Sequence, residues 1–293
     1  MALSRRSLFL LLPALAQLPA SLLAAAAAHA TGGPGDPPAP LPEAKGHDVA
    51  QRTVIVNADD FGESVGVNRG IIEAHERGVV TSASLMVGRP GTVAAVALAR
   101  QRPDLSLGLH VNLDGIGLAL IGQERLDVLG REIERQFKMF TDLTGSLPTH
   151  LDSHHHVHRQ LNVARLFLTL SQRHGIPLRG FSDVVYLGGF YAQWDFGKFD
   201  RRHISVEYLI TLFGKAAPGF TEIGCHPGYT DFVADAAYSW QREVELNTLT
   251  DPRAKASLLA LGIRLVNYRD YGSTVGVTAA QASVPGCQST MTR

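Results

Sequence analysis

From Thr53 onward, short runs rich in β-forming residues alternate with longer segments that have the apolar spacing of helices. The β-rich runs are Thr53–Asn57, Val80–Val87, Leu105–Asn112, His150–His154, Glu222–His226 and Ile263–Tyr268. No hairpin signal joins these runs, so helices must connect successive strands, and strands connected in this way are mostly parallel. The alternation therefore predicts an α/β fold with a parallel sheet, either doubly wound or closed into a barrel.

The first 30 residues are typical of an export signal. Arg5 and Arg6 precede an apolar run over 8–28, and Ala28-His29-Ala30 has the small–x–small pattern of a cleavage site. An uncleaved membrane anchor is the alternative, although prolines interrupt the run. We expect an exported chain, periplasmic or secreted, that begins at Thr31 and keeps no stable membrane span. The arginine pair resembles a twin-arginine signal.

One domain accounts for the rest of the chain. Residues 31–52 contain five of the 15 prolines and are expected to form a linker. Residues 53–272 form the expected domain. Residues 273–293, rich in Ser, Thr, Ala and Gly, are expected to form a flexible tail.

Charge and cysteine content exclude several classes of function. Lys and Arg total 27 and Asp and Glu total 27, so the chain lacks the basic excess of a protein that binds nucleic acid. Only Cys225 and Cys287 are present, which excludes a disulfide framework and a cysteine-rich zinc module. Any metal must therefore be bound by histidine and carboxylate side chains.

Acidic or histidine side chains lie at the ends of several predicted strands. In parallel α/β folds the active site lies at the carboxyl ends of the strands. In 105–112, strand alternation places His110 on one face with Ser106 and Gly108, which leave space at the strand end. A structural histidine with a hydrogen-bond partner is the alternative.

The tract from 150 to 158 holds five of the 12 histidines. An extended conformation would place alternate residues on one face: His150, Asp152, His154, His156 and His158. The alternative is an exposed His-rich tract with incidental metal affinity. The tract lies where a buried strand is expected, so we favour a metal site in which a carboxylate orients an imidazole.

Two further strand ends carry titratable groups. Asp59 and Asp60 follow the first run, and we expect their side chains to point apart, one toward a cation and the other toward a bound water. A turn or helix-cap pair is the alternative. His226 is held by Pro227 at the end of another run, where it is a candidate general acid for a leaving amine. Cys225 points away from it and is expected to be a small buried residue.

Together these motifs resemble the YdjC-like family of carbohydrate deacetylases. The resemblance covers about Thr53 to Tyr271, and its motifs are Asn57–Gly62, Gly108–His110, Thr149–His158 and His226–Gly228. It implies an irregular (β/α) barrel and a hydrolase that removes N-acetyl groups from amino sugars with a divalent metal. Carried over by residue, it implies that Asp60, His110 and His154 are the metal ligands, Asp59 the general base and His226 the general acid.

The resemblance suggests Mg or Zn, whereas mixed His and carboxylate ligands by themselves also suit Mn and Fe. The expected partner is an N-acetylated sugar or glycoconjugate. Candidate sugar contacts near strand ends are Asn112, Arg179 and Tyr229. Two other functions stay open: an exported protein that binds metal and sugar without catalysis, and a hydrolase of another amide or ester on the same barrel. A homodimer is an open alternative to a monomer.

Overall fold

The computed structural model describes residues 51–117, 121–194, 198–231 and 238–274. The predicted export signal, nearly all of the linker, and residues 275–293 of the tail lie outside the described residues. Ordered elements run from Arg52 to Thr274, so the first two residues of the predicted tail belong to a helix. Among the described residues, no helix is both long and apolar enough to cross a membrane.

A seven-stranded sheet forms the centre of the fold, in the order β4-β3-β2-β1-β8-β5, with β9 also paired to β1. Every pair in this sheet is parallel, as the alternating sequence pattern predicted. The strands are β1 (Arg52–Phe61), β2 (Ser82–Leu85), β3 (Ser106–Val111), β4 (Leu151–Ser153), β5 (Val185–Leu187), β8 (Gly219–Cys225) and β9 (Arg264–Leu265). A separate antiparallel pair joins β6 (Gln193–Trp194) to β7 (Lys198–Phe199).

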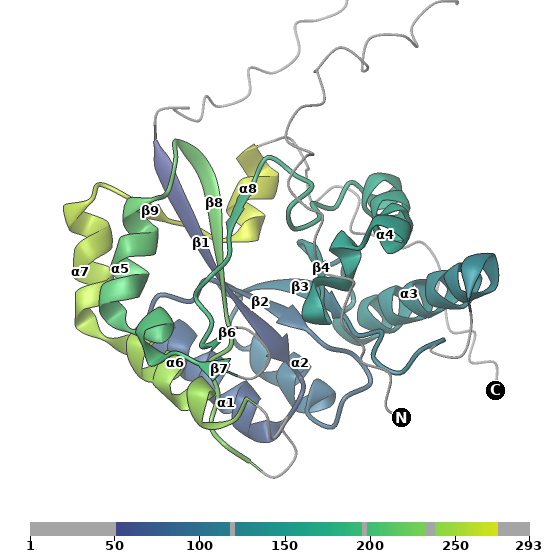
Figure 1. The fold of residues 1–293 in the computed structure, drawn as a ribbon, viewed down its shortest axis with the longest axis horizontal. Helices are drawn as coiled ribbons and strands as arrows, with labels where there is room; N and C mark the ends of the chain where they lie inside the picture. The colour runs from purple at the N-terminus through teal and green to yellow at the C-terminus, as the bar shows by residue number, and fades with distance from the viewer. Residues whose placement is uncertain (1–50, 118–120, 195–197, 232–237, 275–293) are drawn as a thin grey trace, which may run out of the picture. The chain divides into compact units, whose positions relative to one another are not determined.

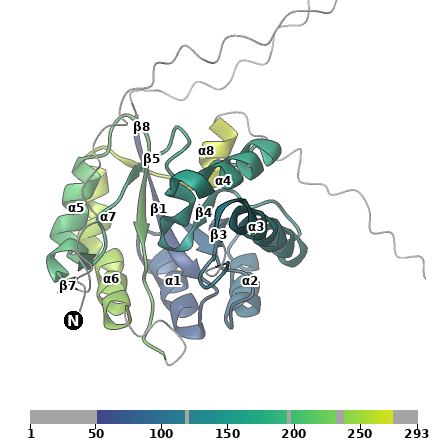
Figure 2. The ribbon, with the colours of Figure 1, turned by 45° about the vertical axis from the view of Figure 1, so that its right-hand side comes forward.

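Helices cover the outside of the sheet in nearly the order of its strands (Figure 1, Figure 2). Neighbouring helices contact one another in the series α4, α3, α2, α1, α6, and α5 packs on both α6 and α7. The helices are α1 (Val65–Arg77), α2 (Thr92–Arg100), α3 (Gly122–Thr144), α4 (Leu161–His174), α5 (Val206–Gly214), α6 (Trp240–Thr250), α7 (Pro252–Ala260) and α8 (Tyr268–Thr274), with 3-10 turns η1 (His154–Arg159) and η2 (Arg201–Ile204).

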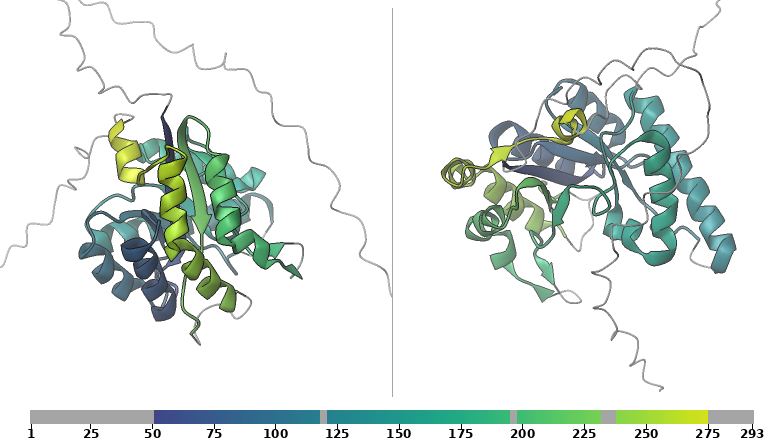
Figure 3. Two further views of the ribbon diagram at one scale, coloured as in Figure 1. Left: turned by 90° about the vertical axis from the view of Figure 1, so that its left-hand side faces the viewer. Right: turned by 90° about the horizontal axis from the view of Figure 1, so that it is seen from above.

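The sheet curls into a half-barrel whose two edge strands, β4 and β5, do not pair with each other (Figure 3). Instead, Leu151 of β4 forms a parallel bridge with Leu178, and the Arg179 N–H donates to the Leu151 carbonyl at 3.0 Å. The chain segment that leads to β5 therefore takes the place of a regular strand beside β4. This arrangement confirms the expected irregular (β/α) barrel.

Strand β1 lies at the centre of the core. Every residue of β1 after Arg52 is buried, because neighbouring strands flank it and side chains cover both of its faces. The carboxyl ends of β1, β3, β4 and β8 meet at one edge of the sheet, which brings residues far apart in the sequence into one pocket.

Candidate active site

The end of β1 contains a β-bulge. Between Ala58 and Phe61, β1 has one more residue than the paired stretch of β2, and Asp60 within it has a left-handed backbone with φ +67°. The extra residue cancels strand alternation, so Asp59 and Asp60 both line the pocket. Within this pocket the two carboxylates bind different partners. Strained backbone of this kind is concentrated at functional sites.

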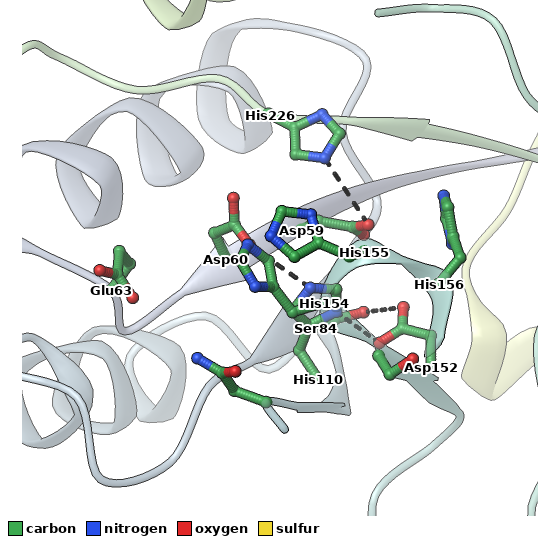
Figure 4. A network of polar contacts seen from close by, with 12 residues as sticks. Asp59, Asp60, Glu63, Ser84, His110, Asp152, His154, His155, His156 and His226 are labelled. Carbon is green, nitrogen blue, oxygen red and sulfur yellow. Dashed lines mark hydrogen bonds and ion pairs between the residues drawn. The ribbon is translucent and has the colours of Figure 1, made fainter. Parts of the chain in front are cut away.

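Asp60, His110 and His154 come together at this edge of the sheet (Figure 4). Asp60 Oδ1 lies 3.4 Å from His110 Nε2 and 4.0 Å from His154 Nε2. It is buried and has no hydrogen-bond partner. Two ligand atoms bound about 2.1 Å from a tetrahedral metal lie about 3.4 Å apart, a value that the Asp60–His110 distance matches and the Asp60–His154 distance exceeds. The donor types and the unpartnered oxygen fit a metal, and the set is more widely spaced than the groups of side chains that have metal-ligand spacing.

Two carboxylates orient the imidazoles of this set. Asp152 Oδ1 lies 2.7 Å from His110 Nδ1, and Asp114 Oδ2 lies 2.7 Å from His154 Nδ1. A carboxylate that accepts the Nδ1–H leaves the Nε2 lone pair of each ring free for a metal. The sequence did not identify Asp114 as a site residue. It lies 40 positions from His154, and no local sequence pattern indicates that the two side chains pair.

Two groups of side chains have metal-ligand spacing among the described residues, and each shares one histidine with the set around Asp60. In the group Asp59, His110 and Asp152, the guanidinium of Arg179 already lies between the carboxylates, with Nη2 2.7 Å from an oxygen of each. A cation there would face a fixed positive charge. The second group, Asp114 with His154 and His155, is largely exposed, and its carboxylate already bonds to His154. Asp60 has a similar contact, because Arg242 Nη2 donates to its other oxygen at 2.7 Å, so the arginines by themselves do not rank these groups against the set around Asp60.

Arg179 is fully buried and lies beneath the pocket, so the expectation that it contacts a sugar is wrong. Its Nη1 and Nη2 donate to the two oxygens of Asp59 at 2.8 and 2.7 Å, and its Nε donates to Glu222 at 2.9 Å. Burial raises the pKa of Asp59, but the charge of Arg179 outweighs this, and the net pKa lies below its usual value. Asp59 is therefore ionised at neutral pH.

His226 follows β8 directly and faces the same pocket. Its Nε2 lies 3.9 Å from Asp59 Oδ2 (Figure 4). Burial lowers the pKa of His226 to about 4, so the ring is neutral at pH 7. The preceding Cys225 is buried, and burial raises the pKa of its thiol well above the usual value, which agrees with the predicted structural role.

The histidine tract does not continue as a strand, which corrects the predicted alternation. β4 ends at Ser153, and the tract turns through η1, where His155 and His156 have φ values of +54° and +51°. His154 enters the metal set, His155 is exposed, and His158 is buried with its Nδ1 2.6 Å from Ser153 Oγ. These histidines therefore share no strand face.

The space beside Gly108 is filled by another histidine. A Cβ at Gly108 would lie 2.4 Å from ring atoms of His150. The His150 ring also stacks on Tyr268, with centroids 3.9 Å apart, and its Nε2 lies 3.0 Å from Ser84 Oγ. The sequence predicted that Gly108 leaves space at the strand end. In the structure the His150 ring fills this space and packs beneath the site.

The pocket has a volume of about 460 Å³, within the usual range for small-molecule sites. Its floor carries the carboxylates and imidazoles described above. Aromatic rings and Arg242 form much of the rest of the lining, and sequence reasoning missed Phe190, Tyr191, Tyr238 and Arg242 because no motif contains them.

The other two candidate sugar contacts lie outside this pocket. Asn112 Oδ1 accepts the backbone N–H of Asp114 at 2.7 Å, so Asn112 fixes the backbone of the residue whose carboxylate orients His154. Tyr229 lines a separate surface depression over α1, where its hydroxyl donates to Glu73 at 2.5 Å. Neither residue lines the pocket that contains Asp60, His110 and His154, and their contact with a sugar stays a prediction.

Comparison with known proteins identifies relatives that span this fold. A family model described as YdjC-like protein matches residues 53–260. A carbohydrate deacetylase from Geobacillus stearothermophilus is 36% identical over 251 residues, covering 75% of this chain and 98% of that protein. A chitooligosaccharide deacetylase from Serratia marcescens is 35% identical over 257 residues, covering 75% and 99%. The crystal structure of a putative cellobiose-phosphate cleavage protein from Enterococcus faecalis V583 matches with a TM-score of 0.65 and 28% identity, covering 75% and 99%.

Proposed function

The chain belongs to the YdjC-like family, and we propose that it hydrolyses N-acetyl groups from chitooligosaccharides or related N-acetylated amino sugars. The predicted family and enzyme class, a carbohydrate deacetylase acting on amide bonds, are confirmed by the relatives. One observation supports the proposed mechanism above all others: the bulge in β1 presents Asp59 and Asp60 to a single pocket but with different partners.

Asp60 Oδ1 and the Nε2 atoms of His110 and His154 would hold a divalent metal, for which the family resemblance suggests Mg or Zn. Such an ion, when bound, polarises the acetamide carbonyl and lowers the pKa of a water molecule. Asp152 and Asp114 keep the two imidazoles in the orientation that this binding needs.

Asp59 is the group that takes a proton from the attacking water. Arg179 keeps it ionised and fixes both of its oxygens, so it enters the reaction in the accepting form. His226 is neutral in the free protein and lies on the pocket side of Asp59. It receives this proton and passes it to the amine nitrogen as the C–N bond breaks. The water hydroxyl goes to the acyl carbon, so the products are acetate and the free amino sugar.

The remaining pocket wall suits a sugar. Tyr186, Phe190, Tyr191 and Tyr238 present aromatic rings around the polar floor. Tyr191 and Tyr238 stack with centroids 4.6 Å apart and an interplanar angle of 18°. A wall of flat apolar surface above a few convergent polar groups is the usual composition of a small-ligand site.

Acetate release tests this proposal. The purified protein, loaded in turn with Mg and Zn, is offered N-acetylglucosamine, N-acetylated chitooligosaccharides of increasing length and an O-acetylated xylan. We expect acetate from at least one N-acetylated sugar, with loss of activity in chelator and in Asp59→Asn. Release from the ester alone would favour the other hydrolase. Tight binding of a chitooligosaccharide without acetate release from any substrate would favour a binding protein.

A further inference from the structure

Two partly exposed aromatic side chains contact each other where β7 meets the start of α6. The rings of Phe199 and Trp240 have centroids 6.1 Å apart in an edge-to-face arrangement, and their elements lie next to each other in Figure 1. Phe199 is 45% exposed and Trp240 is 37% exposed, so the contact leaves much of both rings uncovered. Apolar surface of this kind is a candidate binding surface where it adjoins a pocket.

Both rings are connected to residues that line the pocket. Phe199 pairs with Gln193 across the antiparallel β6–β7 ladder, and residues directly opposite in such a ladder project from the same face. Gln193 lines the pocket. Trp240 comes two residues after Tyr238, which also lines the pocket and stacks on Tyr191. Two separate chain segments thus continue the aromatic wall of the pocket outward to this pair.

A planar polar group lies against the same surface. The turn η2 packs on α6, and the guanidinium carbon of Arg201 in η2 lies 4.4 Å from the centre of the Trp240 ring. Arg201 is exposed, and Trp240 keeps its exposed surface with this arginine in place. A sugar ring has apolar C–H faces and hydroxyl groups around its edge. Aromatic rings beside a guanidinium donor therefore match its two kinds of surface.

We propose that Phe199, Trp240 and Arg201 form a second sugar subsite, which binds the unit next to the N-acetylated sugar in the pocket. This inference rests on the proposed deacetylase function. Only one acetamide of a chitooligosaccharide can reach the set around Asp60 at a time, so the neighbouring units extend out of the pocket. The aromatic pair receives one of them, and this contact favours longer substrates over a single N-acetylated sugar.

The dependence of acetate release on chain length tests the inference. We measure kcat/KM for N-acetylglucosamine and for its oligomers up to the tetramer. In the parent, kcat/KM should increase with length. In Trp240→Ala, the ratio of kcat/KM for the tetramer to that for the shortest sugar hydrolysed by the parent should fall by roughly 10-fold. Trp240→Phe should keep part of the ratio, because an aromatic face remains.

Phe181→Ala is the matched control. Phe181 is also 45% exposed, but its ring contacts His158, and it does not line the pocket. This variant should keep the parent ratio. An unchanged ratio in Trp240→Ala, or a loss of equal size at every chain length, would overturn the inference. Acetate release by the parent would then still support the proposed function.

A binding measurement does not depend on turnover. The tetramer of N-acetylglucosamine is titrated by calorimetry into metal-loaded Asp59→Asn protein, with and without Trp240→Ala. We expect Trp240→Ala to raise Kd by roughly 10-fold and Phe181→Ala to leave it within about twofold. Trp240-dependent binding without acetate release by the parent would support the subsite and contradict the deacetylase function. Absence of binding, or equal Kd values with and without Trp240→Ala, would overturn the subsite.

Discussion

Arg179 binds Asp59 at two points, with Nη1 to Oδ2 at 2.8 Å and Nη2 to Oδ1 at 2.7 Å, and both side chains are buried. The two-point contact fixes the carboxylate plane as well as its charge. The same guanidinium also bonds Glu222 and lies 2.7 Å from Asp152. Removing Arg179 would leave three buried carboxylates without their common cation, so substitutions at Asp59 are the more informative ones.

Asp59→Asn should separate proton transfer from metal binding. The amide is nearly isosteric but cannot take the proton from water, so we expect kcat to fall by roughly 10²–10⁴-fold. Asp60→Asn, one residue along, removes the charged oxygen of the metal set and should lower metal content. Both variants are compared at fixed metal concentration by acetate release and elemental analysis. A fully active Asp59→Asn would show that another group is the base.

His154→Ala tests which histidine of the tract binds metal. Its Nε2 faces Asp60, whereas Nε2 of the exposed His155 next to it lies 3.9 Å from Asp114 Oδ2. We expect His154→Ala to lose metal and activity with little change in the folded structure, and His155→Ala to keep the parent metal content. Elemental analysis and circular dichroism check this. Normal metal content in His154→Ala would exclude it from the ligand set.

Metal affinity should rise with pH. Burial lowers the pKa of His110, but Asp152 and Asp59 outweigh it and raise the pKa to about 10. In the metal-free protein the ring is therefore protonated at neutral pH, and a metal must displace this proton to bind Nε2. Between pH 6 and 8 we expect affinity to increase by about tenfold per pH unit for one released proton. Competition titrations at several pH values measure this. A pH-independent affinity would mean that His110 is already neutral or does not bind the metal.

Gly108→Ala should destabilise the fold. The added Cβ would lie 2.4–2.5 Å from three atoms of the buried His150 ring, which is itself stacked on Tyr268. Overpacking of this kind typically lowers the free energy of unfolding by about 1–3 kcal/mol. Gly130→Ala on α3 is the control, because its Cβ would meet only Leu166 Cδ2 at 3.6 Å. Urea unfolding followed by circular dichroism compares them. Equal stabilities would show that the His150 ring moves aside freely.

We propose that residues 1–30 direct export and are removed after Ala30, on the evidence of Arg5-Arg6, the apolar run and the Ala28-His29-Ala30 pattern. Fractionation of expressing cells and N-terminal sequencing should give an exported chain that begins at Thr31. An Arg5→Lys, Arg6→Lys double variant should be retained if the twin-arginine route is used. Cytosolic protein that still begins at Met1 would exclude export, and an intact chain in the membrane would favour an anchor.

Much of the fold could be predicted because its signals are local. Helical spacing and β-rich runs without hairpin turns imply a parallel sheet, and a parallel sheet gathers its carboxyl ends at one edge. That rule alone brings Asp60, His110 and His226 together. Shared motifs then assigned the family and the enzyme class, which the relatives confirm.

Strand alternation predicts side-chain directions only within a strand, and at the site it was extended past the points where the strands end. A bulge turns Asp59 and Asp60 into the same pocket, and left-handed residues fold the histidine tract into a turn after Ser153. Arg179, given as a sugar contact, is drawn beneath the pocket because three buried carboxylates need a cation. Each of these outcomes depends on partners distant in the sequence.

By itself, then, the sequence determined the order of strands and helices, the residues available at the strand ends and the family to which the chain belongs. Those properties follow from periodicity and motif, which a chain carries along its length. The tertiary structure alone decided the partners: Arg179 for Asp59, Arg242 for Asp60, Asp114 for His154 and Glu245 for His226. These pairings form because burial makes each charge or donor find a neighbour in space, and no local pattern in the sequence records which neighbour the fold will supply.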